Sequence, residues 1–156
     1  MWEQRIKSFS HYLKLERSLS DNSVEGYVAD ALKLKQFVSL TNTSLGPAEV
    51  SPKTLRDFLA YITDLGLSAH SQARILSGIK SFYKYLLFEG VIDSDPTALI
   101  EGPKLGRKLP DTLSFHEIEK LLNAIDLSTA EGARNRAMLE VLYSSGLRVS
   151  ELVDLQ

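Results

Sequence analysis

The sequence predicts an all-helical protein. Apolar residues recur at spacings of three and four along most of the chain, as they do on the buried side of an amphipathic helix. The alternation of apolar and polar residues that marks a half-buried strand is not convincing anywhere. Turns with Gly and Pro separate the helical stretches. We therefore expect helices joined by loops.

Two helices are expected before residue 40. The first carries Trp2 and Ile6 on its apolar side and is expected to end around residues 17–19. The second is expected to start at Ser20 or Asn22, because a short polar side chain there can accept a free N–H of the first helical turn.

A third and a fourth helix follow. The third is expected to begin at Ser51 and Pro52, because the first helical position does not need the N–H that proline lacks; Gly66 is expected to end it. The fourth is expected to run roughly over residues 70–88. Its predicted buried side consists of Ala73, Leu76, Ile79, Phe82, Tyr83 and Leu86. Its predicted opposite side consists of Arg74, Ser77, Gly78, Ser81, Lys84 and Tyr85, with Lys80 at the edge.

The organisation changes after residue 100. The stretch "DSDPTAL" just before it predicts a short capped turn of helix. "EGPKLGRKLPDTL" then combines two prolines, two glycines and three basic residues without helical period, which is typical of a linker. Ser114 and Glu117 form a capping-box pattern before a further helix, and another is expected over about residues 131–144. Its apolar residues, expected to lie mostly inward, are Met138, Leu139, Val141, Leu142 and Tyr143. We predict a domain over 1–100, a basic linker over 101–112 and the start of a second domain over 113–156.

Composition excludes several classes of protein. Cysteine is absent, so a disulfide framework or a thiolate metal site is not available. His11, His70 and His116 do not have the spacing of metal ligands, so no metal and no cofactor is expected. Apolar runs stay well below the roughly 20 residues that span a bilayer, so we expect no membrane partner and a cytoplasmic protein.

The charge distribution says more than the formal net charge of −2. Residues 65–88 contain no acidic residue but include Arg74, Lys80 and Lys84. Such a helix face suits the DNA major groove, where basic side chains neutralise phosphates; a solvated surface with scattered cations is the alternative. The candidate DNA-binding residues are Ser23, Arg74, Ser77, Lys80, Ser81 and Lys84, together with Lys104, Arg107 and Lys108 of the linker.

A complete active site is not expected from these residues. The sequence has no glycine-rich phosphate loop after a strand, and its late serines have no candidate base nearby. Arg148 stands out because it follows the helix-ending Gly146, and its planar fork of donors suits phosphate oxygens. Glu151, three residues on, is placed to hold that fork. A plain surface arginine is the alternative.

The segment "RNRAMLEVLYSSGLRVSELVDL" (134–155) resembles the start of the catalytic domain of tyrosine recombinases of the Xer and phage-integrase kind. "YLKLERSLSDNSVEGYVAD", "ILSGIKSFYKYLLFEGVIDSDPTALI" and "PKLGRKLPDTLSFHEIEKLL" are similar to the family's N-terminal domain, linker and entry to the second domain. The resemblance implies a helical, SAM-like core-binding domain that forms one half of a clamp around double-stranded DNA. It also implies a metal-free reaction through a 3′-phosphotyrosyl intermediate, carried out together with other recombinase protomers.

The resemblance assigns roles to two residues. Arg148 matches the first catalytic arginine, and Glu151 matches the acidic residue that supports it. The other catalytic residues lie further on in the family, and none of the six tyrosines here has the context of the nucleophile. We therefore expect about half of a family member, which binds DNA but does not cleave it. Val28 and Ala29 stand where many Xer-like members carry basic residues, which shifts the expected phosphate contacts to the fourth helix and the linker.

A helical protein-interaction module without a nucleic-acid role is the competing interpretation. It predicts no salt-dependent affinity for DNA and no effect of reversing the charges of Arg74, Lys80 and Lys84. Under the recombinase interpretation, the same triple reversal is expected to leave the fold intact and to weaken DNA binding strongly. Resolution of chromosome dimers and integration of mobile DNA both remain open as the biological reaction.

Overall fold

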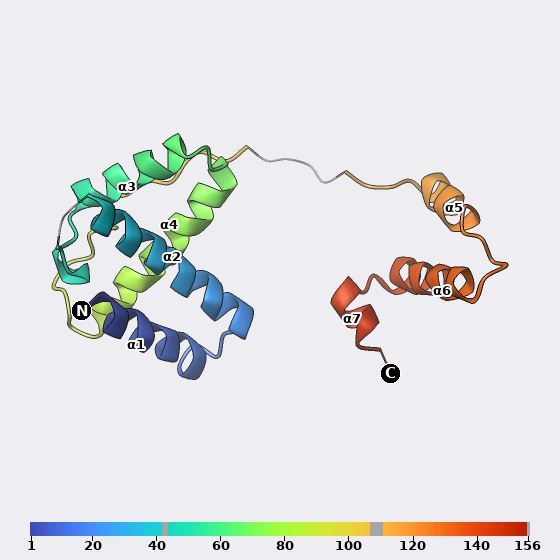
Figure 1. Cartoon of the computed structure of the whole chain (residues 1–156), viewed down its shortest axis with the longest axis horizontal. Coiled ribbons are helices and arrows are strands. Elements are labelled where there is room, and N and C mark those ends of the chain that lie inside the picture. Colours follow the sequence, from blue (N-terminus) through green and yellow to red (C-terminus); the bar gives the residue numbers. More distant parts are fainter. Residues whose placement is uncertain (42–43, 107–110, 156) are drawn as a thin grey trace. The chain divides into compact units, whose positions relative to one another are not determined.

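The computed structural model describes residues 1–41, 44–106 and 111–155. Within these ranges it contains helices and no strand, so the predicted all-α class is confirmed. The chain forms two compact units, Met1–Gly106 and Arg107–Gln156 (Figure 1). The division falls inside the predicted linker, but the predicted domain boundaries stay predictions. In the described part of the chain, no helix is long and apolar enough to span a membrane.

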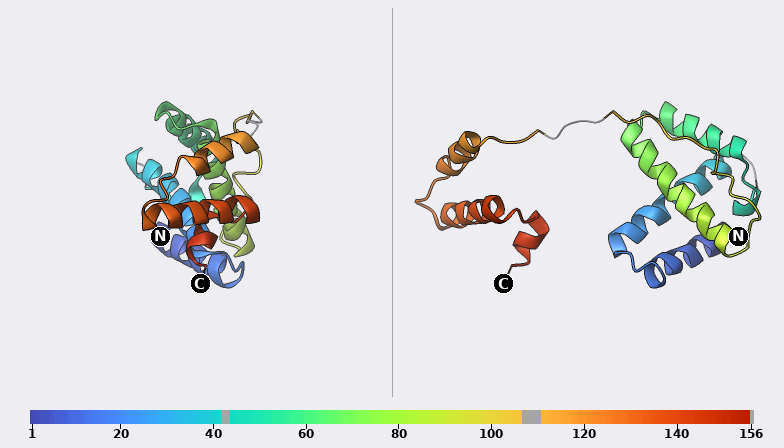
Figure 2. Two further views of the ribbon diagram at one scale, coloured as in Figure 1. Left: turned by 90° about the vertical axis from the view of Figure 1, so that its right-hand side faces the viewer. Right: turned by 180° about the vertical axis from the view of Figure 1, so that it is seen from behind.

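Four α-helices build the first unit: α1 (Trp2–Leu15), α2 (Asp21–Leu40), α3 (Pro52–Asp64) and α4 (Ala69–Phe88). A short 3-10 helix, η1 (Pro47–Glu49), precedes α3. The most extensive helix pairings join α2 to α4 and α1 to α2, which places α2 at the centre of the unit (Figure 2).

Local capping explains where these helices start. The Ser20 hydroxyl accepts the N–H of Ser23 at 3.4 Å, and the Ser51 hydroxyl accepts the N–H of Thr54 at 3.2 Å. Ser51 is the predicted cap of α3, and of the two caps considered for α2, Ser20 and Asn22, the structure has Ser20. The first helix ends at Leu15, earlier than expected, and its chain direction changes at Ser18, whose φ is 49°.

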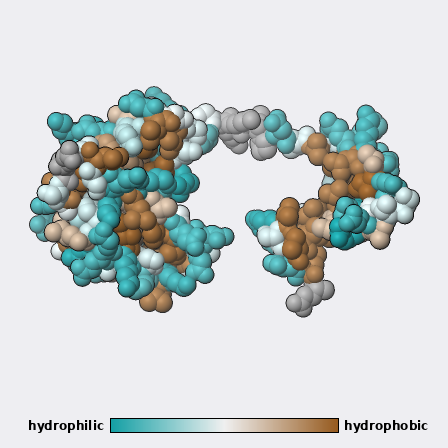
Figure 3. Space-filling view, viewed as in Figure 1, coloured by the Kyte–Doolittle hydropathy of each residue, from teal (hydrophilic) through white to brown (hydrophobic). Residues whose placement is uncertain are grey.

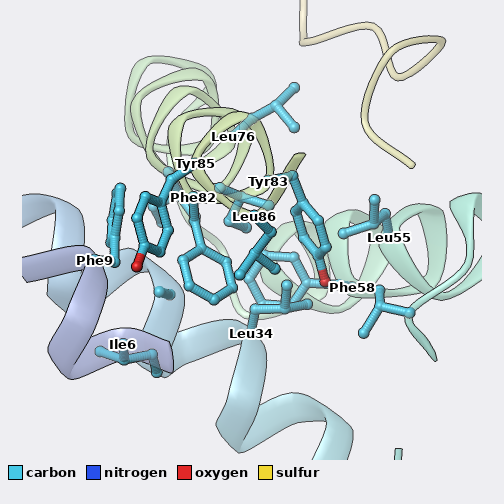
Figure 4. Close-up of a cluster of buried hydrophobic side chains, with 14 of the residues drawn as sticks. Ile6, Phe9, Leu34, Leu55, Phe58, Leu76, Phe82, Tyr83, Tyr85 and Leu86 are labelled. Carbon is cyan, nitrogen blue, oxygen red and sulfur yellow. The ribbon is translucent and has the colours of Figure 1, made fainter. Parts of the chain in front are cut away.

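Aromatic and aliphatic side chains from all four helices form one core (Figure 4). Phe9 of α1 meets Phe82 of α4 edge-on at 5.3 Å between ring centroids. Tyr83 is fully buried, and its hydroxyl donates to the carbonyl of Pro47 at 3.1 Å, which ties η1 to the core. Burial raises the pKa of the Tyr83 phenol far above its usual range.

The exposed side of α4 is narrower than predicted. Gly78 and Tyr85 were assigned to its open side, but both are buried. Tyr85 packs against Phe9 at 5.5 Å and Tyr12 at 5.0 Å between ring centroids. Ala73, expected inside, is only half-buried. The reason is that α4 contacts α1, α2 and α3, so more than one side of it is covered.

The segment before the linker forms turns instead of the predicted turn of helix. The capping part of that expectation holds, because one carboxylate oxygen of Asp95 accepts both the N–H of Thr97 at 2.7 Å and its hydroxyl at 2.6 Å. Ile100, which follows, is buried in the core of the first unit.

The second unit contains α5 (Phe115–Asn123), α6 (Ala130–Ser145) and α7 (Val149–Val153). The predicted capping box is present, since Ser114 and Glu117 bond to each other's backbone N–H. Hydrogen bonds from Ser114 also lower the pKa of the Glu117 carboxyl.

Little of this unit is buried. Gly132 and Leu152 are its only buried residues in the range 111–155. The inward position expected for several residues of α6 is therefore wrong: Met138, Val141 and Tyr143 are exposed, while Leu139 and Leu142 are half-buried. α5 and α7 are short and do not cover these side chains of α6, so apolar surface remains open on this unit (Figure 3).

Candidate nucleic-acid interface and catalytic arginine

A hollow of about 260 Å³ lies between α2 and α4. It brings together three of the predicted DNA-binding residues, Ser23 from α2 and Arg74 and Ser77 from α4. Ser23 lies at least 51 positions before Arg74 and Ser77 in the sequence. Their meeting therefore depends on how α2 packs on α4. The remaining lining residues are Asn22, Gly26, Tyr27 and Asp30.

Arg74 does not stand free in this hollow. Its Nη1 donates to Oδ2 of Asp30 at 3.0 Å, and its Nη2 donates to Oδ1 at 2.7 Å. Asp30 is only 1% exposed, whereas the Arg74 side chain remains 56% exposed. Lys33 adds a third contact, from its Nζ to Oδ1 of Asp30 at 3.2 Å. A buried carboxylate therefore anchors a half-exposed guanidinium.

Asp30 was missed as a site residue, although its position carried a signal. It lies three residues after Tyr27 and four before Leu34, which are both on the apolar side of α2. An acidic residue at that spacing is placed to point into the core, where a charge needs a partner.

Gly78 explains how Asp30 fits against α4. A Cβ atom at this glycine would lie 2.3 Å from Oδ2 and 2.8 Å from Cβ of Asp30. Gly78 was expected on the open side of α4, but the glycine faces Asp30. Its missing side chain lets the carboxylate of α2 sit directly on the α4 backbone.

The other candidates on α4 continue the open strip of this helix. Ser77 and Lys84 are exposed, and Lys80 and Ser81 are half-buried. Neither lysine forms a salt bridge to a residue within the described ranges. Positions 74, 77, 81 and 84 are three or four apart, so they share one side of the helix.

The linker candidates are only partly visible. Lys104 is exposed in the structure. Arg107 and Lys108 lie outside the described residues, so their contribution stays a prediction.

The second unit carries Arg148 at the start of α7. Gly146 ends α6 in the left-handed region with φ 66°, and Arg148 is the N-cap residue of α7. The N–H of Arg148 donates to Oε2 of Glu151 at 2.7 Å, and its Nη1 donates to Oε1 at 3.2 Å. The Arg148 side chain is 83% exposed. The structure thus joins the two predicted catalytic residues and presents the guanidinium to solvent.

A tyrosine nucleophile and a metal site are the two other kinds of chemistry to consider among the described residues. Tyr83 is buried with its hydroxyl occupied, and Tyr143 borders an apolar hollow between α5 and α6. Among the residues that the structure describes, no group of three or more His, Asp or Glu side chains is placed to hold a metal ion.

Comparison with known proteins agrees with this architecture. Residues 6–90 match the family described as "Phage integrase, N-terminal SAM-like domain", and residues 111–156 match "Phage integrase family". A protein named tyrosine recombinase XerD from Oceanobacillus iheyensis is 40% identical over 155 residues, which cover 99% of this chain and 52% of that protein.

Similar values hold for other proteins of that name. The one from Listeria monocytogenes is 40% identical over 97% of this chain and 51% of its own length. The one from Pseudomonas putida is 43% identical over 96% of this chain and 50% of its own length. The chain spans about half the length of these relatives. The two consecutive family matches cover both units and confirm the predicted resemblance, so the chain belongs to the phage integrase family of tyrosine recombinases.

Proposed function

We propose that this chain is the DNA-binding N-terminal part of a site-specific tyrosine recombinase. Its α2–α4 surface binds double-stranded DNA, and the longer parent protein cuts and rejoins DNA through a 3′-phosphotyrosyl intermediate. The observation that carries the proposal is the meeting of Ser23, Arg74 and Ser77 around one hollow, on a side of α4 that continues two turns further to the exposed Lys84. Hydroxyl and cationic groups from two helices are the donors that most often bind phosphate oxygens.

The local electrostatics support DNA binding despite the net charge of −2. The stretch 65–88, which includes all of α4, has no acidic residue. Among the residues that line the hollow, Asp30 carries the one carboxylate, and it is buried and contacts two cations. A DNA backbone approaching α4 therefore meets positive charge, and each phosphate neutralised releases counterions.

For the catalytic step of the parent protein, we propose that Arg148 stabilises the transition state. Phosphoryl transfer gathers negative charge on the non-bridging oxygens, and a fixed guanidinium stabilises that charge most when it is greatest. Glu151 restricts the guanidinium through the 3.2 Å contact, so less side-chain freedom is lost on binding. This arrangement requires donors rather than a metal or organic cofactor.

Within residues 1–156 we propose DNA binding without cleavage. Tyr143 is the one tyrosine of the second unit, and it lines an apolar hollow with Leu113 and Leu139. Tyr143 is exposed, but a nucleophile also needs a neighbouring set of donors, and the other residues that line this hollow are leucines and an isoleucine. The relatives are about twice as long as this chain, and we assign the nucleophile, the remaining donors and the contacts to other protomers to that further sequence.

The test is fluorescence anisotropy of the chain with duplex DNA across a salt series. We expect affinity to fall steeply with salt and Lys84→Gln to weaken it. Lys53→Gln is the matched control, because it removes the same charge from an exposed position on α3. An affinity that is absent even at low salt, or that both variants change equally, would favour the protein-interaction module.

A further inference from the structure

We propose that Asp30 is a positioning residue for DNA binding: it holds the guanidinium of Arg74 so that the hollow between α2 and α4 receives one backbone phosphate. This inference rests on the proposed function and adds to it a specific subsite and a residue that never touches DNA. The hydrogen bonds that fix the pair, at 3.0 and 2.7 Å, join helices whose paired residues are 44 positions apart.

The pairing leaves Arg74 able to bind a ligand. A guanidinium carries five N–H donors in a fixed fork, and Asp30 accepts two of them. Three donors remain, on a side chain that is 56% exposed. Two hydrogen bonds already fix the orientation of the planar guanidinium, so it loses little conformational entropy when a phosphate binds.

Other donors border the same space. Ser77 is exposed on α4, and Asn22 and Ser23 line the hollow from α2. Hydroxyl and amide groups bind phosphate oxygens alongside arginine in protein–DNA interfaces. The hollow thus combines a fixed charged donor with neutral ones.

The charge at the site suits a phosphodiester. Asp30 contacts both Arg74 and Lys33, so the three side chains together carry one positive charge. The negative member is 1% exposed, while both positive members are about half exposed. Of the two cations, Arg74 lines the hollow, so a phosphate at its mouth meets the guanidinium and is separated from the buried carboxylate.

Gly78 fixes where the carboxylate sits. Because a Cβ there would lie 2.3 Å from Oδ2, Asp30 rests against the α4 backbone one turn after Arg74. The guanidinium position is therefore set by the packing of α2 on α4. Gly26, whose added Cβ would lie 3.7 Å from Nη1 of Arg74, lines the same hollow from α2.

The experiment compares four versions of the full 156-residue chain: wild type, Asp30→Asn, Arg74→Gln and the double variant. Each is titrated with the same duplex DNA over a salt series, below its unfolding transition. If Asp30 acted only through its charge, Asp30→Asn would tighten binding, because it removes a negative charge. A positioning role predicts the opposite: affinity falls about tenfold, and the slope of log affinity against log salt becomes shallower by about 0.9.

The other variants separate the alternatives. Arg74→Gln is expected to show the same loss of affinity and slope, and Asp30→Asn is expected to cause no further loss in that background. Unchanged or tighter binding by folded Asp30→Asn would overturn the positioning role, and so would an unchanged slope for Arg74→Gln. If wild type itself shows no salt-dependent affinity, the proposed function fails and this inference fails with it.

Arg74→Lys provides a second route if Asp30→Asn does not fold. It keeps the charge but cannot form the planar fork. We expect it to lose about tenfold in affinity; wild-type affinity and slope would again overturn the proposal. Circular dichroism melts of every variant establish that the titrated protein is folded.

Discussion

Replacing Gly78 by alanine should destabilise the first unit, although the same change in an ordinary helix stabilises it. Gly78 lies within α4, where alanine has the better helix propensity by about 1 kcal/mol. The added Cβ, however, would sit 2.3 Å from Oδ2, 2.8 Å from Cβ and 2.9 Å from Cγ of Asp30. Asp30 must therefore move as a whole, and rotating its carboxylate does not relieve the contact.

The magnitude follows from that movement. Ordinary van der Waals contact begins at 3.4 Å, so Oδ2 must retreat by about 1 Å, which breaks or lengthens the 2.7 and 3.0 Å bonds to Arg74. Overpacking a core costs about 1–3 kcal/mol, and breaking a buried ion pair costs about 3–5 kcal/mol. The Asp30–Arg74 ion pair is strained and not deleted, so only part of this cost applies. The better helix propensity of alanine offsets about 1 kcal/mol, and we expect the free energy of unfolding to fall by about 3 kcal/mol.

Urea unfolding, monitored by tryptophan fluorescence, measures this loss of stability in the first unit. Trp2 is the single tryptophan of the chain, and it is buried in the first unit with its indole N–H bonded to the carbonyl of Leu45 at 2.8 Å. Its signal reports on that unit. We expect a lower urea midpoint, with an unchanged slope of the unfolding free energy against urea concentration.

Gly26 provides the matched control within the same pair of helices. A Cβ there would meet Nη1 of Arg74 at 3.7 Å, an ordinary contact distance. Gly26→Ala should therefore stabilise the unit by about 0.5–1 kcal/mol through helix propensity alone. If Gly78→Ala also stabilises, α2 and α4 do not approach as described, and the placement of Asp30 is wrong.

Three further predictions concern charge. Lys80→Glu with Lys84→Glu should leave the fold intact and weaken DNA binding at least tenfold, because two basic side chains on α4 are replaced by groups that repel phosphates; anisotropy and circular dichroism check both parts. Arg74→Glu should instead cost about 3–5 kcal/mol in unfolding free energy, since it faces the buried Asp30 with a second carboxylate; a wild-type urea midpoint would contradict this. Arg148→Ala in the full-length protein should abolish strand exchange while DNA binding persists, and recombination at the wild-type rate would remove the arginine from the catalytic centre.

The Arg74→Glu prediction replaces an expectation made from sequence. Reversing Arg74 together with Lys80 and Lys84 was expected to spare the fold, because all three were counted as surface cations. The 2.7 Å bond to a carboxylate that is 1% exposed makes Arg74 part of the packing between α2 and α4. The triple reversal therefore mixes lost binding with lost stability, whereas the two-lysine reversal does not.

Features encoded by neighbouring residues were predictable. Ser20 and Ser51 cap their helices through residues only three positions away. The sequence pattern located the start at Ser51 directly and limited the other start to Ser20 or Asn22. The burial of Gly78 and Tyr85 was not predictable in this way. It depends on how many helices surround α4, which is a property of the folded unit and not of the helix pattern.

The same distinction separates the two halves of the candidate site. Gly146, Arg148 and Glu151 lie within six residues, and a left-handed glycine followed by a capped helix start joins the arginine to the glutamate without help from other elements. The phosphate subsite instead requires residues 44 positions apart to meet at 2.7 Å. A substitution that loosens α2 on α4 should therefore weaken DNA binding while leaving the Arg148–Glu151 pair intact, because only the first arrangement depends on long-range packing.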